Sequence, residues 1–151
     1  MESKLLVIDA SVAGAASEKE HPRSSACRKT LDSALAICHR IVFCKKLLQE
    51  WKEHKGRYAS CWLDSMLARR KVQMPKDTDQ PQNELPAGVQ LNEKELEAYK
   101  KDSHLLEVAL TSDKIIITLD DNLIDICRKI RKYSAIRFIN PEKEPDAVCG
   151  L

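Results

Sequence analysis

The feature that most constrains the fold is an uninterrupted apolar run at residues 5–8, LLVI, which stops at Asp9. A strand with one face in water alternates apolar and polar side chains, whereas a strand covered on both faces is apolar throughout. The run therefore predicts a parallel strand at the centre of a sheet. An acid directly after such a strand carries its charge at the border of the core, so it needs a partner there.

Three further segments have the same character and are separated by helical patterns. They are the runs at 41–43, 115–118 and 136–139, which are rich in β-branched residues. The stretches between them place apolar residues three or four positions apart, as on one face of a helix. This alternation predicts an α/β fold with a central parallel sheet of about four strands and helices on both faces.

The length of the chain suits one compact domain, which we expect over residues 1–151. With 43% hydrophobic and 32% charged residues, a chain of 151 residues supports one core. Residues 73–88 hold three prolines among polar residues without periodicity. This segment predicts a flexible loop over 73–90.

The six cysteines include no Cys-x-x-Cys pair, which argues against a zinc site or a disulfide framework. Glu2 and Asp9 interrupt the basic start and apolar run that a signal peptide would show. No stretch approaches the length of a membrane span. We therefore expect a soluble, cytoplasmic protein that does not interact with a membrane.

Four acidic residues stand out by their position. Asp9 and Asp120 follow two of the predicted strands, at the edge of a parallel sheet where ligands bind. Glu50 lies beside the apolar face of the helix after the second strand. Asp102 shares a helical stripe with the leucines that follow it, at what we expect to be the start of a helix. Each has an ordinary alternative, because Asp102 and Asp121 also suit helix caps and Glu50 suits a solvated helix face.

If these acids converge, their charges predict a metal site. Carboxylates gathered in one partly buried place repel one another, and a cation removes that repulsion. Hard divalent ions prefer oxygen ligands and keep water available for chemistry, so Mg²⁺ or Mn²⁺ is the expected cofactor. Asp9, Asp102 and Asp120 are the predicted ligands. Glu50 is predicted to bind the metal through water or to orient a nucleophile.

Four short motifs, each containing one of these acids, follow one another along the chain. They are LLVIDAS with Asp9, IVFCKKLLQEW with Glu50, DSHLLEVAL with Asp102 and IIITLDDNL with Asp120. Through them the chain resembles the PIN domain family over most of its length, the segment near 73–88 excepted. The resemblance implies a three-layer α/β/α fold and a metal-dependent endoribonuclease, an activity that often belongs to the toxin of a toxin–antitoxin pair.

The resemblance also assigns roles. It implies that Asp9, Glu50, Asp102 and Asp120 form the catalytic metal site, and that two hydroxyl groups support this site through hydrogen bonds. The hydroxyl groups are those of Ser11 and Thr118. The family has a further acid after the last of these strands, and three residues compete for that position, namely Asp121, Asn122 and Asp125. His54 and His104 are expected to be surface or internally satisfied histidines and not ligands.

Basic residues gather in the first half of the chain. Residues 1–75 carry 14 Lys and Arg against 8 acids, and residues 76–151 carry 11 against 15. Such asymmetry suits a protein with a basic surface that binds an anionic ligand and a separate cluster of acidic residues. The predicted RNA contacts are Lys45, Lys46, Arg69, Arg70 and Lys71, although solvated helix faces explain these residues equally well.

Other acidic α/β sites fit less well. A dehalogenase-type phosphatase would need a second aspartate where Ser11 stands, and a response-regulator receiver would need an acidic pair where the chain has only Asp9. Phosphate-binding glycine patterns are absent from a chain with four glycines. The expected partners are RNA as substrate, an antitoxin-like protein, and a second copy of the chain in a homodimer. The alternative is a noncatalytic PIN-like module that binds RNA or a protein.

Overall fold

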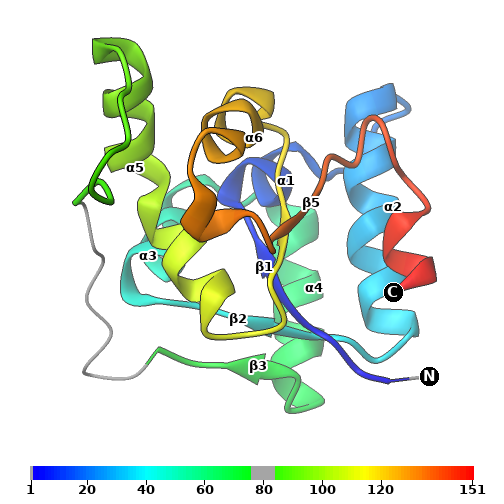
Figure 1. The fold of residues 1–151 in the computed structure, drawn as a ribbon. Coiled ribbons are helices and arrows are strands. Elements are labelled where there is room, and N and C mark those ends of the chain that lie inside the picture. Colours follow the sequence, from blue (N-terminus) through cyan, green and yellow to red (C-terminus); the bar gives the residue numbers. More distant parts are fainter. Residues whose placement is uncertain (1, 76–83) are drawn as a thin grey trace.

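The computed structural model describes residues 2–75 and 84–151, in which strands and helices alternate around one sheet (Figure 1). The strands are β1 Leu5–Ile8, β2 Arg40–Val42, β3 Val72–Gln73, β4 Ile115–Ile117 and β5 Arg137–Ile139. The helices are α1 Ala10–Ala15, α2 Pro22–Ala36, α3 Lys45–His54, α4 Arg57–Ala68, α5 Glu93–Leu110 and α6 Asp121–Arg128. Two short 3-10 turns, η1 Arg131–Tyr133 and η2 Ala147–Gly150, lie near the carboxyl terminus.

The sheet is parallel throughout, with the strand order β3-β2-β1-β4-β5. The predicted parallel α/β sheet is therefore confirmed, with five strands where the sequence indicated about four. The additional strand is β3, which has only two residues and ends inside the segment predicted as a loop. Of that predicted loop, residues 76–83 lie outside the described residues.

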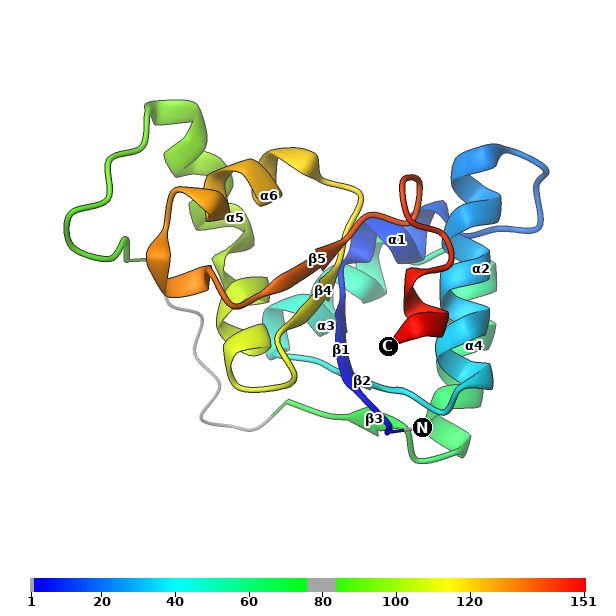
Figure 2. The same cartoon turned by 45° about the vertical axis from the view of Figure 1, so that its right-hand side comes forward.

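The strand order creates a switch in direction beside β1. The chain first builds outward from β1 to β2 and β3, and then returns to the other side of β1 for β4 and β5. Because crossovers between parallel strands are right-handed, this reversal sends α2 and α4 to one face and α5 and α6 to the other (Figure 2). Helices on both faces of the sheet give the three-layer α/β/α arrangement. Open sheets of this kind bind ligands at the carboxyl edge of the switch point, which here lies between β1 and β4.

Two tryptophans tie helices to the core. Trp51 is fully buried in α3, and its Nε1 donates to the carbonyl oxygen of Ile8 at 2.8 Å. Trp62 in α4 donates in the same way to Leu31 at 2.6 Å. A buried indole N–H needs such an acceptor. Since Ile8 is the last residue of β1, the Trp51 bond fixes α3 beside the end of the central strand.

Helix α1 is short and has no clear signal in the sequence, where residues 10–15 are mostly small. Its small residues allow a close approach to the end of α3. A Cβ at Gly14 would lie 2.9 Å from the carbonyl oxygen of His54, and the amide of Gly56 donates to the carbonyl of Ala13 at 3.2 Å. The two helices therefore pack backbone to backbone at the carboxyl edge of the sheet.

Helix α5 runs from a capping box at Asn92 without a break to Leu110. In this capping box the side chains of Asn92 and Glu95 each accept a hydrogen bond from the other residue's backbone amide. The expectation that Asp102 stands at a helix start is wrong, because it lies in the second half of this helix. Among the described helices, none is both long and apolar enough to pass through a membrane.

Candidate functional site

The four acids singled out in the sequence line one cavity of about 440 Å³. They come from four elements: Asp9 follows β1, Asp120 follows β4, Glu50 belongs to α3 and Asp102 to α5. The remaining lining residues are Ala10, Ser11, Gly14, His54 and Lys101. The cavity thus lies at the switch point of the sheet, where the ends of β1 and β4 meet α3 and α5.

Two hydroxyl groups hold the carboxylate of Asp9. Ser11 Oγ donates to Asp9 Oδ2 at 2.9 Å, and Thr118 Oγ1 donates to the same oxygen at 2.8 Å. Asp9 precedes α1 at its N-cap position, but its side chain makes no capping hydrogen bond. The structure therefore provides both hydroxyl contacts that the resemblance implies, and both go to one oxygen of Asp9.

Asp120 has two connections at once. Its Oδ1 caps α6 by accepting from the amides of Asn122 at 2.9 Å and Leu123 at 3.4 Å. Its own amide donates to Thr118 Oγ1 at 3.1 Å, so the Thr118 hydroxyl links Asp120 to Asp9. The side chain of Asp120 therefore caps α6 with one carboxylate oxygen and also lines the cavity.

Asp102 is the most buried of the four acids, with 8% of its surface exposed. Burial and the charges of Asp9 and Asp120 together raise the pKa of Asp102 to about 6. Both causes act because Asp102 is buried and the three carboxylates line the same cavity. The repulsion predicted for these acids is therefore present at Asp102.

Glu50 is held from outside the cavity by a histidine. His104, from α5, is 1% exposed, and its Nε2 contacts Glu50 Oε1. Burial alone would raise the pKa of Glu50, but the contact with His104, aided by Lys46 and Lys101, holds that pKa below its ordinary value. Glu50 is half-buried and paired, so a solvated position on a helix face does not describe it.

Two lysines flank the cavity on the side of α3 and α5. Lys101 lines the cavity, and Lys46 Nζ donates to the carbonyl oxygen of Lys101 at 2.9 Å. Lys45 is exposed beside Lys46 at the start of α3. Lys46 and Lys101 place positive charge next to Glu50.

The other predicted RNA contacts lie elsewhere. Arg69, Arg70 and Lys71 connect the end of α4 to the start of β3. Because all strands run in the same direction, the start of β3 lies at the edge of the sheet opposite to the acids (Figure 1). The structure therefore does not bring these three residues to the acidic cavity.

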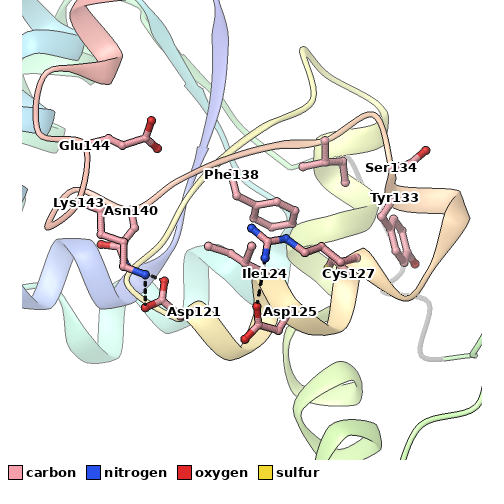
Figure 3. Close-up of a pocket in the computed structure, with 12 residues that line it drawn as sticks. Asp121, Ile124, Asp125, Cys127, Tyr133, Ser134, Phe138, Asn140, Lys143 and Glu144 are labelled. Atoms are coloured by element: carbon pink, nitrogen blue, oxygen red, sulfur yellow. Dashed lines mark hydrogen bonds and ion pairs between the residues drawn. The ribbon is translucent and has the colours of Figure 1, made fainter.

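The two further acids that the sequence offers, Asp121 and Asp125, face a different hollow. This second hollow, of about 660 Å³, lies between α6 and β5 and contains both residues in its wall (Figure 3). Asp121 pairs with Lys143 at 3.0 Å and accepts from Asn140 Nδ2 at 3.1 Å, and Asp125 pairs with Arg128 at 3.6 Å. Neither carboxylate joins the acidic cavity, so neither is placed to support it.

The acids of the cavity do not by themselves form a complete set of metal ligands. Over residues 2–75 and 84–151, no group of three or more His, Cys, Asp or Glu side chains is arranged so that it could hold a metal ion as it stands. Mg²⁺, however, keeps several of its waters and binds proteins through one or two carboxylates. Asp9, Asp102 and Asp120 are the candidate ligands of this kind.

Sequence reasoning misses the residues that act through packing. The motifs of the sequence assign His104 no part in the site, and Lys101 and Gly14 belong to none of these motifs. A signal for Lys101 and His104 exists in their spacing, because residues three apart share one face of a helix.

Comparison of the chain with family models, with curated proteins and with solved structures finds no match.

Proposed function

We propose that this chain is a metal-dependent endoribonuclease of the PIN type, which hydrolyses RNA phosphodiester bonds with Mg²⁺ or Mn²⁺. The observation that carries the proposal is the environment of Asp102. This buried carboxyl has its pKa raised by burial and by Asp9 and Asp120 in the same cavity. Perturbed carboxylates in a cavity at a sheet switch point favour a functional site over a structural one.

The residues of the cavity fit a hard divalent cation. Asp9, Asp102 and Asp120 offer oxygen donors, and their repulsion is the condition that a bound cation relieves. When bound, the ion would activate water and stabilise charge on the leaving oxygen. The carboxylates would hold it, with water completing its coordination.

The remaining residues have roles that follow from their contacts. Ser11 and Thr118 keep the Asp9 carboxylate from rotating, since both donate to its Oδ2. Glu50 reaches the cavity from α3 with a lowered pKa, so it stays ionised and suits orientation of the attacking water. Lys101 and Lys46 offset the acidic charge on one side, where a phosphate of the substrate can approach.

The resemblance to PIN domains supports the same assignment. Its motifs place Asp9, Glu50, Asp102 and Asp120 in the family's order, and these are the acids that line the cavity. RNA as the substrate rests on this resemblance. The proposals of a toxin role, of an antitoxin-like partner and of a homodimer rest on it alone.

A noncatalytic PIN-like module is the second candidate, and one observation favours it. In the described part of the chain, no set of three or more potential ligands is ready to hold an ion. A module of this kind would bind RNA or a protein without cleaving RNA, and it would show no response to divalent ions.

The test of the proposal is cleavage of a fluorescent single-stranded RNA by the purified chain. With millimolar Mn²⁺ or Mg²⁺ we expect endonucleolytic products, and with a chelator we expect none. Cleavage that persists in the chelator would indicate a contaminating, metal-independent nuclease or a different chemistry. Binding of RNA without cleavage at any ion concentration would favour the noncatalytic module.

A further inference from the structure

Glu50 and His104 form a buried contact between α3 and α5 that the proposed mechanism does not require by itself. His104 lies two positions after Asp102, and residues two apart on a helix point to different sides. It lies three positions after Lys101, whose carbonyl accepts from Lys46 of α3. His104 therefore belongs to the face of α5 that packs on α3, and it reaches the cavity only through Glu50.

We infer that His104 is a positioning residue, which fixes the carboxylate of Glu50 in the acidic cavity. The inference rests on the proposed nuclease function and goes beyond it by assigning a residue outside the acids. The backbone of Glu50 is already fixed, because the next residue, Trp51, is bonded to Ile8 at the end of β1. What stays free is the rotation of the Glu50 side chain, and the contact of Oε1 with His104 Nε2 removes that freedom.

The surroundings of His104 argue against a purely structural role. Its ring is 1% exposed, and within the described residues its Nδ1 has no hydrogen-bond partner. A buried polar atom without a partner destabilises the fold. Glu50 Oε1, the oxygen that contacts the ring, is buried as well, whereas the rest of the Glu50 side chain is partly exposed. An apolar side chain at position 104 would remove the unpartnered Nδ1 but leave Glu50 Oε1 without its contact, so the carboxylate would have to turn toward the cavity to reach water.

The expected signature is a loss in the rate of cleavage without a loss in substrate binding. Residues that orient a functional side chain typically contribute about 10- to 100-fold to activity when they are removed. The groups placed to meet the phosphates, Lys46 and Lys101, are untouched by a change at His104. The turnover number should fall, and KM should stay close to that of the wild type.

The test is a double-mutant cycle in RNA cleavage with Mn²⁺, comparing His104→Leu, Glu50→Gln and the pair. We expect His104→Leu to lower kcat about 10- to 100-fold with an unchanged KM, in a variant that still unfolds cooperatively. If His104 acts through Glu50, the double variant should lose no more than Glu50→Gln alone. His104→Gln, whose amide can still donate to Glu50, should recover most of the rate. Should the leucine variant not fold, His104→Met replaces it in the cycle.

Two results would overturn the inference while leaving the proposed function intact. One is wild-type kcat in a well-folded His104→Leu, and the other is an equal further loss in the Glu50→Gln background. A crystal structure of His104→Leu gives a readout that does not depend on activity: the Glu50 carboxylate should leave the cavity, and an unmoved carboxylate contradicts the inference. Absence of RNA cleavage by the wild type is a different result, because it overturns the proposed function.

Discussion

Asp120 and Asp121 are neighbours in the sequence, yet their carboxylates face two different hollows of the molecule. Asp120 lines the acidic cavity and caps α6, whereas Asp121 pairs with Lys143 on the side of β5 (Figure 3). Asp120 is the N-cap of α6 and Asp121 is its first residue, and consecutive residues of a helix point in different directions. The chain therefore offers a matched pair of acids, one inside the candidate site and one outside it.

The raised pKa of Asp102 predicts a dependence of stability on pH. An acid whose pKa rises on folding keeps a proton that the unfolded chain releases, so it destabilises the fold progressively between about pH 4 and pH 6, and fully above that. The change from 3.8 to about 6 corresponds to about 3 kcal/mol. Without divalent ions, Asp102→Asn should unfold with a higher free energy than the wild type at pH 8, by at most this amount.

The gain of Asp102→Asn should shrink as the pH falls and be largely lost at pH 4, because the folded wild type then keeps its proton and the unfolded chain, with a pKa of 3.8, has regained part of its own. Urea denaturation at pH 4, 6 and 8 measures it. Asp125→Asn is the control, because Asp125 is exposed and lies outside the cavity. A difference between Asp102→Asn and the wild type that is equal at all three pH values would show that charge repulsion at Asp102 is not its cause.

Divalent ions should reverse this destabilisation. An ion that binds only the folded chain raises the melting temperature by mass action, and at 100 times its Kd the gain is about 2.7 kcal/mol. For a chain of this size, that corresponds to several degrees. Thermal melts with Mn²⁺ should show this shift for the wild type and for Asp125→Asn, and little of it for Asp102→Asn. The same shift in all three would place the ion outside the acidic cavity.

Charge on the side of α3 and α5 should govern RNA binding. In an Asp120→Asn background, replacing Lys46 and Lys101 with Gln should lower the salt slope of RNA affinity by about one for each phosphate that is no longer neutralised. Replacing Arg69, Arg70 and Lys71 gives the opposing test, because these residues lie at the other edge of the sheet. If their replacement changes the slope and that of the two lysines does not, the substrate lies on the opposite edge.

The close packing of α1 on α3 can be tested through a glycine. Gly14→Ala would place a Cβ 2.9 Å from the carbonyl oxygen of His54, so one of the two helices must move. Overpacking of this kind typically costs about 1–3 kcal/mol. Gly150→Ala is the control, because no atom lies within 4 Å of its added Cβ. Equal melting temperatures of the two variants would show that the close approach is not a constraint.

The parts of the fold that can be predicted from sequence are those that local patterns determine. The apolar runs before Asp9 and Asp120 are typical of strands covered on both faces, and acids that end such strands lie at one edge. Asp102 is recognisable because it shares a helical stripe with apolar residues, although the predicted helix start at Asp102 is wrong. These inferences need no knowledge of which strands are neighbours.

The parts that cannot be predicted from sequence depend on long-range packing. Strand order is one, because no local pattern says that β4 pairs with β1 on the side away from β2. His104 is another: its partner Glu50 is distant in sequence, and only the packing of α5 on α3 joins them. A strand as short as β3 carries no periodicity to detect. In each case the missing information is which surfaces meet.

The most direct measurement of the central claim is the rate of Mn²⁺-dependent RNA cleavage by Asp120→Asn and Asp121→Asn beside the wild type. Asparagine is as good an N-cap as aspartate, so Asp120→Asn should fold normally while losing a negative oxygen of the site. We predict at least about a 100-fold lower rate for Asp120→Asn, and a rate close to the wild type for Asp121→Asn. Equal rates for all three proteins, each verified as folded, would contradict the assignment of the acidic cavity as the site of cleavage.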